Sequence, residues 1–376
     1  MLFAETLSSQ RLTSRATFFP QKIRKQITPI LYYSATDFQR VTPLGDNISV
    51  NTKPEPLRIV TTFPFEPEEI ARIRMAAGAP VEILICRDRE EFRRRLPEAD
   101  VVYGDLRAAE LALARRLRWI QASAAGLDDM DRVVLESPVP LTNYAATFAP
   151  AIAETAMGML LSLTRGISTY YVPQFLKRTM NPVGTMKSAH HTELAGRTMG
   201  IAGMGGIGRA LARKAHCGFE MRVVATDAGS APKPDYVAEL HDPSWLLEMV
   251  SHADVVVAAA PLTPATERMF NEEVFRCMKK TAIFLALSRG RLFDDLALVR
   301  ALKEGWIAGA CLDVFPQEPP PSDHPIFDCP NVVMTAHTAG WGPDRQDRLV
   351  ALFAENVRRF AAGEPLLNLV DKAKGY

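Results

Sequence analysis

The sequence predicts an α/β protein built on two doubly wound parallel sheets. Short β-rich runs alternate with helical runs from Leu57 to about Leu141, and a second series of strands follows from Met199. Alternation of this kind is typical of parallel sheets that carry helices on both faces. A long apolar helix, 149–164, lies between the two series and is expected to bridge them. The 376 residues suffice for two or three domains of ordinary size.

The first sheet is expected to form a discontinuous domain of residues 57–150 and 338–376. β-Rich runs predict its strands, and runs with helical spacing predict its helices. In chain order these are strand 58–63, helix 66–77, strand 81–86, helix 90–96, strand 101–103, helix 108–117 and strand 119–122. The last helix, roughly 344–362, is expected to cross back to this domain and to close it.

The second sheet is expected within residues 151–337. Its strands are predicted from apolar runs at 199–202, 223–226, 254–260, 282–287, 308–314 and 332–336.

Residues 1–56 differ from the rest of the chain. They contain only three alanines, and between Glu5 and Asp37 there are five basic residues and no acids. This composition resembles a transit segment for organelle import. It equally resembles an unstructured extension, or sequence upstream of the true start, and the residues do not distinguish these alternatives.

Composition argues against several classes of function. A content of 47% hydrophobic and 23% charged residues is that of an ordinary soluble globular protein. The net charge of +1 gives no electrostatic argument for nucleic acid or an anionic membrane as partner. The five cysteines are scattered and never spaced as CxxC, which favours a reducing compartment such as the cytoplasm and predicts no zinc site. His190, His191 and Glu193 are adjacent in a polar stretch, and we expect no metal there.

Residues 199–227 carry the most informative motif. They are predicted to form a strand, a glycine turn, a helix, a second strand and then an acid, which is the layout of a dinucleotide-binding unit. Gly203 permits a tight turn, Gly205 lets backbone N–H groups approach a pyrophosphate, and Gly208 lets helix and strand pack closely. Cofactor contacts are therefore predicted at this turn, including the intervening Gly206 and Ile207, and at the N-terminus of the helix.

Asp227 stands nineteen positions after Gly208, at the end of the second strand. A carboxylate at this point can accept hydrogen bonds from the adenosine ribose, which favours NAD over NADP. Because Gly229 and Ser230 follow, Asp227 could instead cap a turn. Lys233 is the nearest downstream cation, so use of NADP stays open.

Three polar residues follow three successive strands of the second sheet. These are Arg289, Glu318 and His337. Since parallel strands all end at the same edge of a sheet, the three side chains are expected to converge on one ligand beside the dinucleotide. Each residue alone has an ordinary structural explanation, such as an ion pair or a solvated loop acid. Together, behind a nucleotide turn, they favour a catalytic site.

These motifs resemble the D-isomer-specific 2-hydroxyacid dehydrogenase family, which includes glyoxylate, hydroxypyruvate and phosphoglycerate enzymes. The similarity spans about residues 57–370 and is carried by the segments IAGMGGIGRALA, APLTPATERMF, LSRGRLFDD, ALKEGWIAGACLDVFPQEP and HPIFDCPNVVMTAHTAG. The resemblance implies an NAD-dependent oxidoreductase with a Rossmann domain, a flavodoxin-like substrate domain and a homodimer built around helix 149–164. It places the family's catalytic arginine, glutamate and histidine on Arg289, Glu318 and His337.

The resemblance also implies further contacts. Its substrate-loop motif falls on Ala124, Ala125 and Gly126, whose backbone N–H groups would hold a substrate carboxylate oxygen. Its carboxamide-binding aspartate falls on Asp313, and Pro261 and Thr266 lie in the segment that contacts the cofactor. Trp341 could wall the substrate pocket or merely pack.

The expected reaction moves a hydride between NAD(H) and a small D-2-hydroxy or 2-keto acid. His337 would exchange the proton with the substrate oxygen, Glu318 would orient the imidazole, and Arg289 would bind the carboxylate and keto oxygens. Three residues depart from the family pattern: Ala146 replaces a common glycine, Ala286 a common asparagine, and Ala336 a common proline. None of these changes removes a reacting group.

Two other functions share much of this pattern. Corepressors related to the C-terminal-binding proteins retain the same three residues as NAD(H)-sensing scaffolds, but this chain ends 39 residues after His337, without the long tail expected there. Enzymes acting on formate or phosphite are a second alternative. Formate enzymes resemble the family with glutamine where Glu318 stands, so Glu318 argues against formate.

Overall fold

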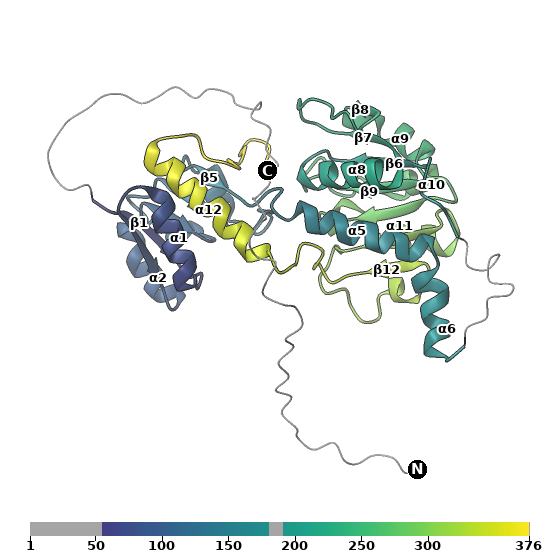
Figure 1. Ribbon diagram of the computed structural model, residues 1–376, viewed down its shortest axis with the longest axis horizontal. Helices are drawn as coiled ribbons and strands as arrows, with labels where there is room; N and C mark the ends of the chain where they lie inside the picture. The colour runs from purple at the N-terminus through teal and green to yellow at the C-terminus, as the bar shows by residue number, and fades with distance from the viewer. Residues whose placement is uncertain (1–54, 180–190, 376) are drawn as a thin grey trace, which may run out of the picture. The chain divides into compact units, whose positions relative to one another are not determined.

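The computed structural model describes residues 55–179 and 191–375, which contain two parallel sheets (Figure 1). The expectations for residues 1–54 and for His190 lie outside the described residues. In spatial order, the five-stranded sheet consists of β2 (Val81–Ile85), β1 (Leu57–Thr61), β3 (Val101–Tyr103), β4 (Trp119–Gln121) and β5 (Leu141–Thr142). The seven-stranded sheet consists of β12 (Val332–Met334), β11 (Gly309–Leu312), β10 (Ile283–Ala286), β9 (Val255–Ala258), β6 (Thr198–Ala202), β7 (Arg222–Thr226) and β8 (Glu239–His241).

Every pair of neighbouring strands in both sheets is parallel. The first sheet has the 2-1-3-4-5 order of flavodoxin-like folds, and the second has the Rossmann order extended by one strand. The predicted fold class is therefore confirmed. Two short strands, β5 and β8, were not predicted: β5 has only two residues, and the residues of β8 are only partly buried and form no apolar run.

The helices of the first domain begin and end at recognisable signals. They are α1 (Pro67–Ala77), α2 (Arg89–Arg95), α3 (Ala108–Leu111), α4 (Arg132–Glu136) and α12 (Arg345–Ala362). For example, α1 starts at a proline, the Glu69 carboxylate accepts a hydrogen bond from the Glu66 N–H at 2.9 Å, and the helix ends at Gly78 with φ of 62°.

Helix α3 is shorter than the predicted helix 108–117. After Leu111 the chain continues in tight turns, with N–H to C=O bonds from Ala114 to Leu111 and from Leu117 to Ala114. These three side chains pack on one hydrophobic cluster at a three-residue spacing. That spacing suits tight i to i−3 turns better than an α-helix.

The other described α-helices lie between residues 149 and 303. They are α5 (Ala149–Thr164), α6 (Val172–Leu176), α8 (Gly206–Phe219), α9 (Leu246–His252), α10 (Glu272–Cys277) and α11 (Asp295–Lys303). Helix α5 has the predicted bounds and packs against α8, β11 and β12. No described helix combines the length and the apolar character needed to cross a membrane.

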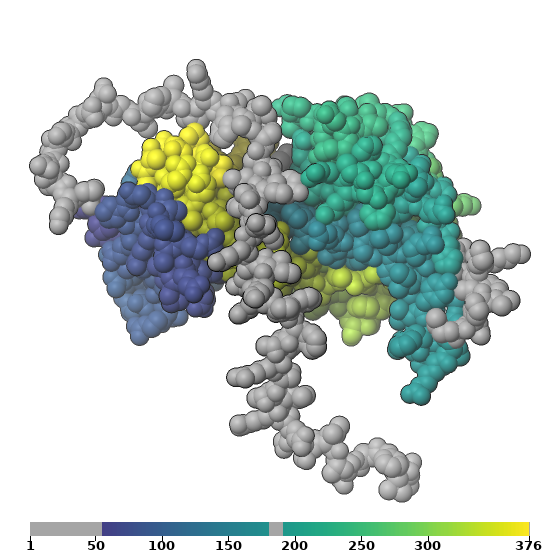
Figure 2. All heavy atoms as spheres, in the orientation of Figure 1, coloured from purple at the N-terminus to yellow at the C-terminus, as the bar shows by residue number. Residues whose placement is uncertain are grey.

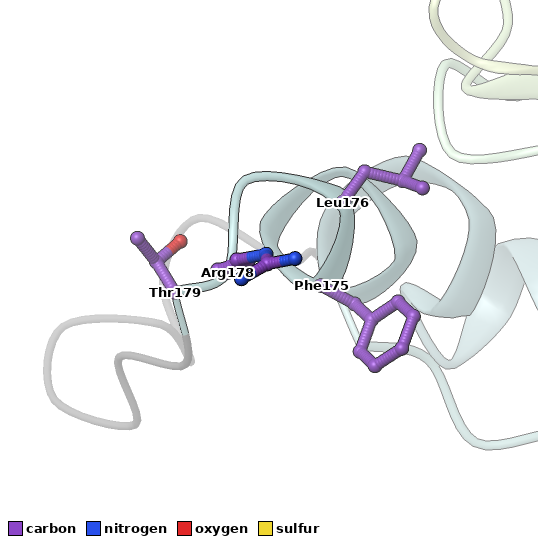
Figure 3. A pocket seen from close by; sticks show the side chains of 4 residues that line it. All are labelled: Phe175, Leu176, Arg178 and Thr179. Atoms are coloured by element: carbon purple, nitrogen blue, oxygen red, sulfur yellow. The ribbon is translucent and has the colours of Figure 1, made fainter.

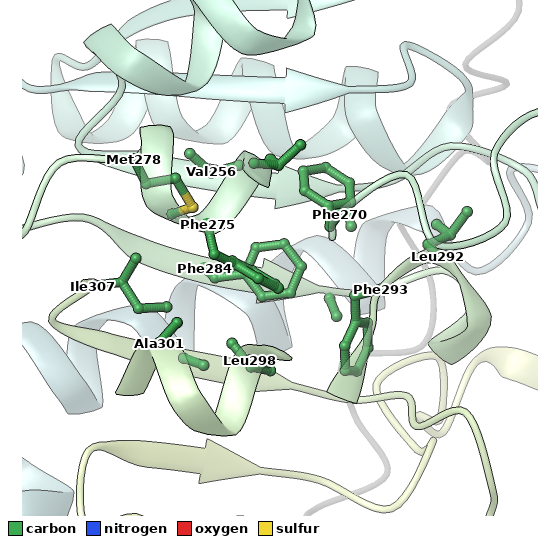
Figure 4. Close-up of a cluster of buried hydrophobic side chains, with 14 of the residues drawn as sticks. Val256, Phe270, Phe275, Met278, Phe284, Leu292, Phe293, Leu298, Ala301 and Ile307 are labelled. Carbon is green, nitrogen blue, oxygen red and sulfur yellow. The ribbon is translucent and has the colours of Figure 1, made fainter. Parts of the chain in front are cut away.

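Two hydrophobic clusters cover the two faces of the seven-stranded sheet. Along β10, Phe284 and Ala286 belong to one cluster, whereas Ile283 and Leu285 belong to the other. Figure 4 shows the first cluster, in which Phe284 lies between Phe275 and Phe293, with ring centroids 5.2 and 5.7 Å away. Burial on both faces fixes the strands whose ends carry the candidate site.

The C-terminal helix completes the first domain. Helix α12 packs on α1, and Leu349, Val350 and Phe353 enter the same buried cluster as Ile59 of β1. In Figures 1 and 2 the yellow C-terminal segment accordingly lies against the purple start of the described chain. The Asn356 side chain also donates to the backbone of Leu367 at 3.0 Å and accepts from it at 2.7 Å. The C-terminal helix α12 thus packs with elements from the start of the described chain.

We expect Phe353→Ala to destabilise the first domain strongly. The Phe353 ring is fully buried, and its centroid lies 4.6 Å from that of Tyr103 and 5.6 Å from that of Trp119. Removing a buried aromatic ring costs about 3–5 kcal/mol. Urea unfolding monitored by tryptophan fluorescence would measure the loss. Phe327→Ala, at a ring that is 55% exposed, is the control and should change the unfolding free energy by less than about 0.5 kcal/mol. Equal losses of unfolding free energy in both variants would contradict the expectation that α12 is part of the core of the first domain.

Candidate active site

The glycine turn places the start of α8 close to the ends of β6 and β9. Gly203 has φ of 102°, and a Cβ there would lie 2.5 Å from the Ala260 nitrogen. A Cβ at Gly208 would lie 2.0 Å from the Gly203 carbonyl oxygen, whereas a Cβ at Gly205 would meet nothing within 4 Å. Gly203 and Gly208 are therefore required by the fold itself, and the space beside Gly205 is open for a ligand.

The first turn of α8 has unpaired donors. Within residues 55–179 and 191–375, no group accepts a hydrogen bond from the backbone N–H of Gly206, Ile207 or Gly208. Free N–H groups at the N-terminus of a 14-residue helix, next to open space, suit a pyrophosphate. The residues present therefore fit a dinucleotide.

Asp227 supports the glycine turn from the end of β7. One carboxylate oxygen accepts a hydrogen bond from the Met204 N–H, and the other accepts from the Gly229 N–H at 2.7 Å. Asp227 therefore caps its own turn, which is the structural alternative that the sequence raised, and it also lies beside the glycine turn. The nearby cations are held by backbone carbonyls: Lys233 donates to Val237 at 2.7 Å, and Arg209 donates to Met204 at 2.8 Å.

The loop after β9 contains Pro261 and Thr266. The Thr266 hydroxyl donates to the Pro261 carbonyl at 2.7 Å and accepts from the Thr263 N–H at 2.8 Å. Thr266 therefore shapes the loop through its own hydrogen bonds, at the edge of the sheet next to the glycine turn.

His337 and Glu318 are in direct contact. The His337 Nδ1 atom lies 2.7 Å from one oxygen of Glu318, and the other oxygen accepts a hydrogen bond from the Phe315 N–H at 2.8 Å. A carboxylate beside Nδ1 selects the tautomer with a proton on that nitrogen, which leaves Nε2 free for a ligand. About half of the His337 side chain is exposed, so Nε2 can be reached from outside.

Arg289 follows β10 and is held on two sides. Its Nε donates to the Asp128 carboxylate, and its Nη1 donates to the Ser288 carbonyl at 2.7 Å. The neighbouring Gly290 lies against the Phe315 backbone, because a Cβ at Gly290 would be 1.8 Å from the Phe315 carbonyl carbon. Since Phe315 also binds Glu318, Arg289 and the Glu318–His337 pair belong to adjoining loops at the same edge of the sheet.

The predicted substrate loop lies directly beside Arg289. An ideal Cβ on Gly126 would be only 1.2 Å from Arg289 Nη2. The carbonyls of Ala124 and Ala125 accept hydrogen bonds from Tyr144 N–H and the Asn143 side chain, at 3.1 and 2.9 Å. In the part of the chain that the structure describes, the N–H groups of Ala124, Ala125 and Gly126 have no acceptor. They can therefore bind one oxygen of an anionic ligand.

Asp128 is a site residue that the sequence reasoning missed. Its carboxylate pairs with Arg289, two residues beyond Gly126. The sequence places three acids close together here, Asp128, Asp129 and Asp131, and only the folded loop distinguishes the one that faces the arginine. Asp131, by contrast, caps α4 by accepting from the Val133 N–H at 3.0 Å.

Asp313 lies at the end of β11 and is buried, with 3% of its surface exposed. Its Oδ1 atom accepts hydrogen bonds from the Thr335 hydroxyl and from the N–H groups of Thr338 and Ala339, at 2.6, 3.0 and 3.0 Å. The carboxylate that was predicted to contact a carboxamide is therefore bonded to the loop that carries His337.

Two of the departures from the family pattern lie at or beside a residue with left-handed backbone. Ala146 has φ of 65°, in the left-handed region that glycine adopts without strain, and its Cα would lie 2.5 Å from a Cβ on Gly206. Ala336 precedes His337, which itself has φ of 55°. Ala286 is fully buried in β10, and nothing in the structure explains why asparagine is absent there.

Trp341 does not pack into the core. Its side chain is 69% exposed, and the Arg345 guanidinium carbon lies 5.9 Å from its ring centroid and 5.1 Å from that of Phe148. Among the described residues, no group of three histidine, cysteine, aspartate or glutamate side chains is arranged to hold a metal ion.

Comparison with known proteins gives consistent matches. Residues 157–339 match the family model for the D-isomer specific 2-hydroxyacid dehydrogenase, NAD binding domain. The chain is 37% identical over 269 residues to a glyoxylate reductase of Korarchaeum cryptofilum, a match that covers 69% of this chain and 77% of that one. It is 30% identical to a D-3-phosphoglycerate dehydrogenase of Methanocaldococcus jannaschii, over 84% of this chain and 59% of the other.

A solved structure is similar over both sheets. The NADPH-dependent glyoxylate/hydroxypyruvate reductase of Sinorhizobium meliloti, in complex with NADP and sulfate, superposes with a TM-score of 0.70 at 27% identity. The match covers 85% of this chain and 99% of that chain.

We expect Gly126→Ala to displace the Arg289 guanidinium, because the new Cβ would occupy the position of Nη2. A displacement of about 1 Å can lower kcat/KM for a 2-keto acid about 10²-fold. NADH affinity, measured by energy transfer from protein to nicotinamide, should be unchanged. Gly218→Ala is the matched control, since a Cβ there meets nothing within 4 Å. Wild-type kcat/KM in Gly126→Ala would show that the guanidinium position is unimportant.

Proposed function

Because the chain belongs to the D-isomer-specific 2-hydroxyacid dehydrogenase family, we propose that it reduces small 2-keto acids of the glyoxylate and hydroxypyruvate type with NADH. Enzymes of this family are oxidoreductases that transfer a hydride between a nicotinamide dinucleotide and a 2-keto or 2-hydroxy acid. The observation that carries the proposal is the 2.7 Å contact between His337 and Glu318 at the edge of the sheet that holds the glycine turn. The glyoxylate reductase relatives and the S. meliloti reductase support the choice of substrate.

His337 is proposed as the residue that gives and takes the proton. The bound dinucleotide supplies the hydride, and the substrate oxygen gains a proton as its carbon is reduced. Protonated His337 holds that proton on Nε2, while its Nδ1–H donates to Glu318. The Glu318 carboxylate keeps the ring from rotating, because its second oxygen is held by the Phe315 N–H.

Arg289 is proposed to bind the substrate. Since Asp128 takes Nε and Ser288 takes one Nη1 proton, the edge formed by Nη1 and Nη2 is left for the substrate carboxylate and keto oxygen. The free N–H groups of Ala124, Ala125 and Gly126 would hold the second carboxylate oxygen. Arg289 belongs to the proposed cofactor domain and the N–H groups belong to the proposed substrate domain, so a bound acid would contact both domains.

The cofactor is proposed to be NAD rather than NADP. The glycine turn, from Gly203 to Gly208 with Ile207, would bind the pyrophosphate, and the Asp227 carboxylate lies where a 2′-phosphate would be repelled. Lys233 and Arg209 are bonded to backbone carbonyls instead of being free to neutralise that phosphate. Pro261, Thr266 and Asp313 are proposed to line the rest of the cofactor site. We assign residues 57–150 and 338–376 to the substrate domain and 151–337 to the cofactor domain.

Turnover with a panel of 2-keto acids tests the function. Oxidation of NADH and of NADPH would be followed with glyoxylate, hydroxypyruvate, pyruvate and bulkier 2-keto acids. We expect turnover with the small acids, a preference for NADH, and a loss of about 10²- to 10⁴-fold in rate for His337→Asn at nearly unchanged NADH affinity. Tight NADH binding without turnover on any acid would favour an NAD(H)-sensing scaffold. Full activity of His337→Asn would refute the proposed proton transfer.

The protein is further proposed to be a cytoplasmic homodimer. The apolar side chains of α5 are mostly buried within the chain, but the segment that follows leaves Phe175 and Leu176 more than 70% exposed. Figure 3 shows these two side chains with Arg178 and Thr179 around a shallow pocket at the end of α6. A second copy of the chain would cover this apolar surface. The scattered, unpaired cysteines support the reducing compartment.

Light scattering coupled to gel filtration tests the assembly. We expect twice the chain mass of 41.6 kDa for the wild type and a shift toward one chain mass for the double variant Phe175→Asp and Leu176→Asp. Charged residues at a buried apolar contact oppose association because they lose their hydration. Phe327→Asp, at another exposed ring, is the control and should leave the mass unchanged. A wild type that elutes as a single chain would rule out the homodimer.

A further inference from the structure

Asp313 makes hydrogen bonds that its expected contact with the cofactor does not explain. The loop after β12 approaches the end of β11 so that Oδ1 of Asp313 accepts from the Thr335 hydroxyl, the Thr338 N–H and the Ala339 N–H. His337 lies within this loop, and its own N–H donates to the Asp313 backbone carbonyl at 2.8 Å. The side chain and the backbone carbonyl of Asp313 therefore hold the loop on both sides of His337.

The conformation of the loop needs such support. His337 has φ of 55°, a left-handed conformation that costs free energy for a residue with a Cβ. Ala336 before it lacks the fixed φ that a proline would supply. Successive N–H groups that point to one side create an anion-binding concavity, and here the anion is the Asp313 carboxylate. Because Asp313 is buried, its charge is compensated by these hydrogen bonds rather than by bulk water.

We propose that Asp313 is a positioning residue for His337, whose buried carboxylate holds loop 335–339 in the conformation that brings the imidazole to Glu318. The proposal rests on the role of His337 in the proposed function. In this proposal Oδ1, which accepts hydrogen bonds from three donors, is the atom that holds the loop. Among the described residues, Oδ2 accepts only from Ala339, at 3.2 Å, and it is the oxygen proposed for the carboxamide. Positioning and cofactor contact thus depend on different atoms of the same residue.

Two variants separate these roles. Asp313→Ala removes both oxygens. Thr335→Val removes one donor to Oδ1 without changing the shape of residue 335 or the oxygen that faces the cofactor. Asp254→Ala is the matched control: its carboxylate also accepts from a backbone N–H of the same sheet, that of Thr198 at 2.9 Å, but it lies at the opposite ends of the strands.

Steady-state kinetics with glyoxylate and NADH binding are measured for all three variants. We expect kcat to fall about 10²-fold in Asp313→Ala and several-fold in Thr335→Val, because the imidazole is misplaced, while KM for glyoxylate stays within about twofold. Thr335→Val should bind NADH like the wild type, and Asp254→Ala should keep the wild-type kcat. If Asp313→Ala does not fold, Thr335→Val decides alone. Unchanged kcat in Thr335→Val, or a loss confined to NADH affinity, would overturn the proposal.

A spectroscopic measurement separates this inference from the proposed function. Ring ¹³C and ¹⁵N signals of His337, assigned by their loss in His337→Asn, are recorded for the same proteins without substrate. We expect them to shift in Asp313→Ala and Thr335→Val and to stay at the wild-type positions in Asp254→Ala. Shifts of this kind would support the positioning role even if the wild type turned over no 2-keto acid. Identical His337 signals in all variants would overturn it.

Discussion

The site of this protein depends on one constraint, which is that parallel strands end together. β9, β10, β11 and β12 all run in the same direction as β6, so the loops after them meet at one edge. Between β6 and β9 the order of the strands reverses, and in open α/β sheets ligands bind outside the strand ends at such a point. The glycine turn, Arg289, Glu318 and His337 are far apart in the chain but share this edge for that reason alone.

Close approach of backbones sets the positions of the remaining groups. The Arg289 guanidinium lies where a Cβ of Gly126 would be, and Ala146 lies where a Cβ of Gly206 would be. Both contacts join loops of the five-stranded sheet to loops of the seven-stranded sheet. At this contact Ala146 has a left-handed backbone conformation, which costs free energy for a residue with a Cβ. A glycine would adopt the same backbone without strain. A substrate anion held by Arg289 and by residues 124–126 would add to these contacts.

Much of the fold was predictable because burial on both faces gives long apolar runs. Six of the seven strands of the second sheet and helix α5 follow from such runs, within two residues at most of the ends. Helix α12 follows from apolar residues at helical spacing and was predicted to within one residue. Short elements such as β8 were not predictable, since their residues are only partly buried and their pairing depends on a strand already in place. Within the site, the sequence placed residues at strand ends but not their partners. Asp128 pairs with Arg289 across 161 positions, and no local pattern encodes that contact.

The two carboxylates around His337 differ in surroundings, and this difference explains how both can serve one imidazole. Glu318 is more than one-third exposed and contacts the ring itself. Asp313 is buried and directs its charge to hydroxyl and backbone donors, so it fixes the loop without competing for the ring proton. The acid that contacts the imidazole is therefore a different residue from the acid that anchors its backbone.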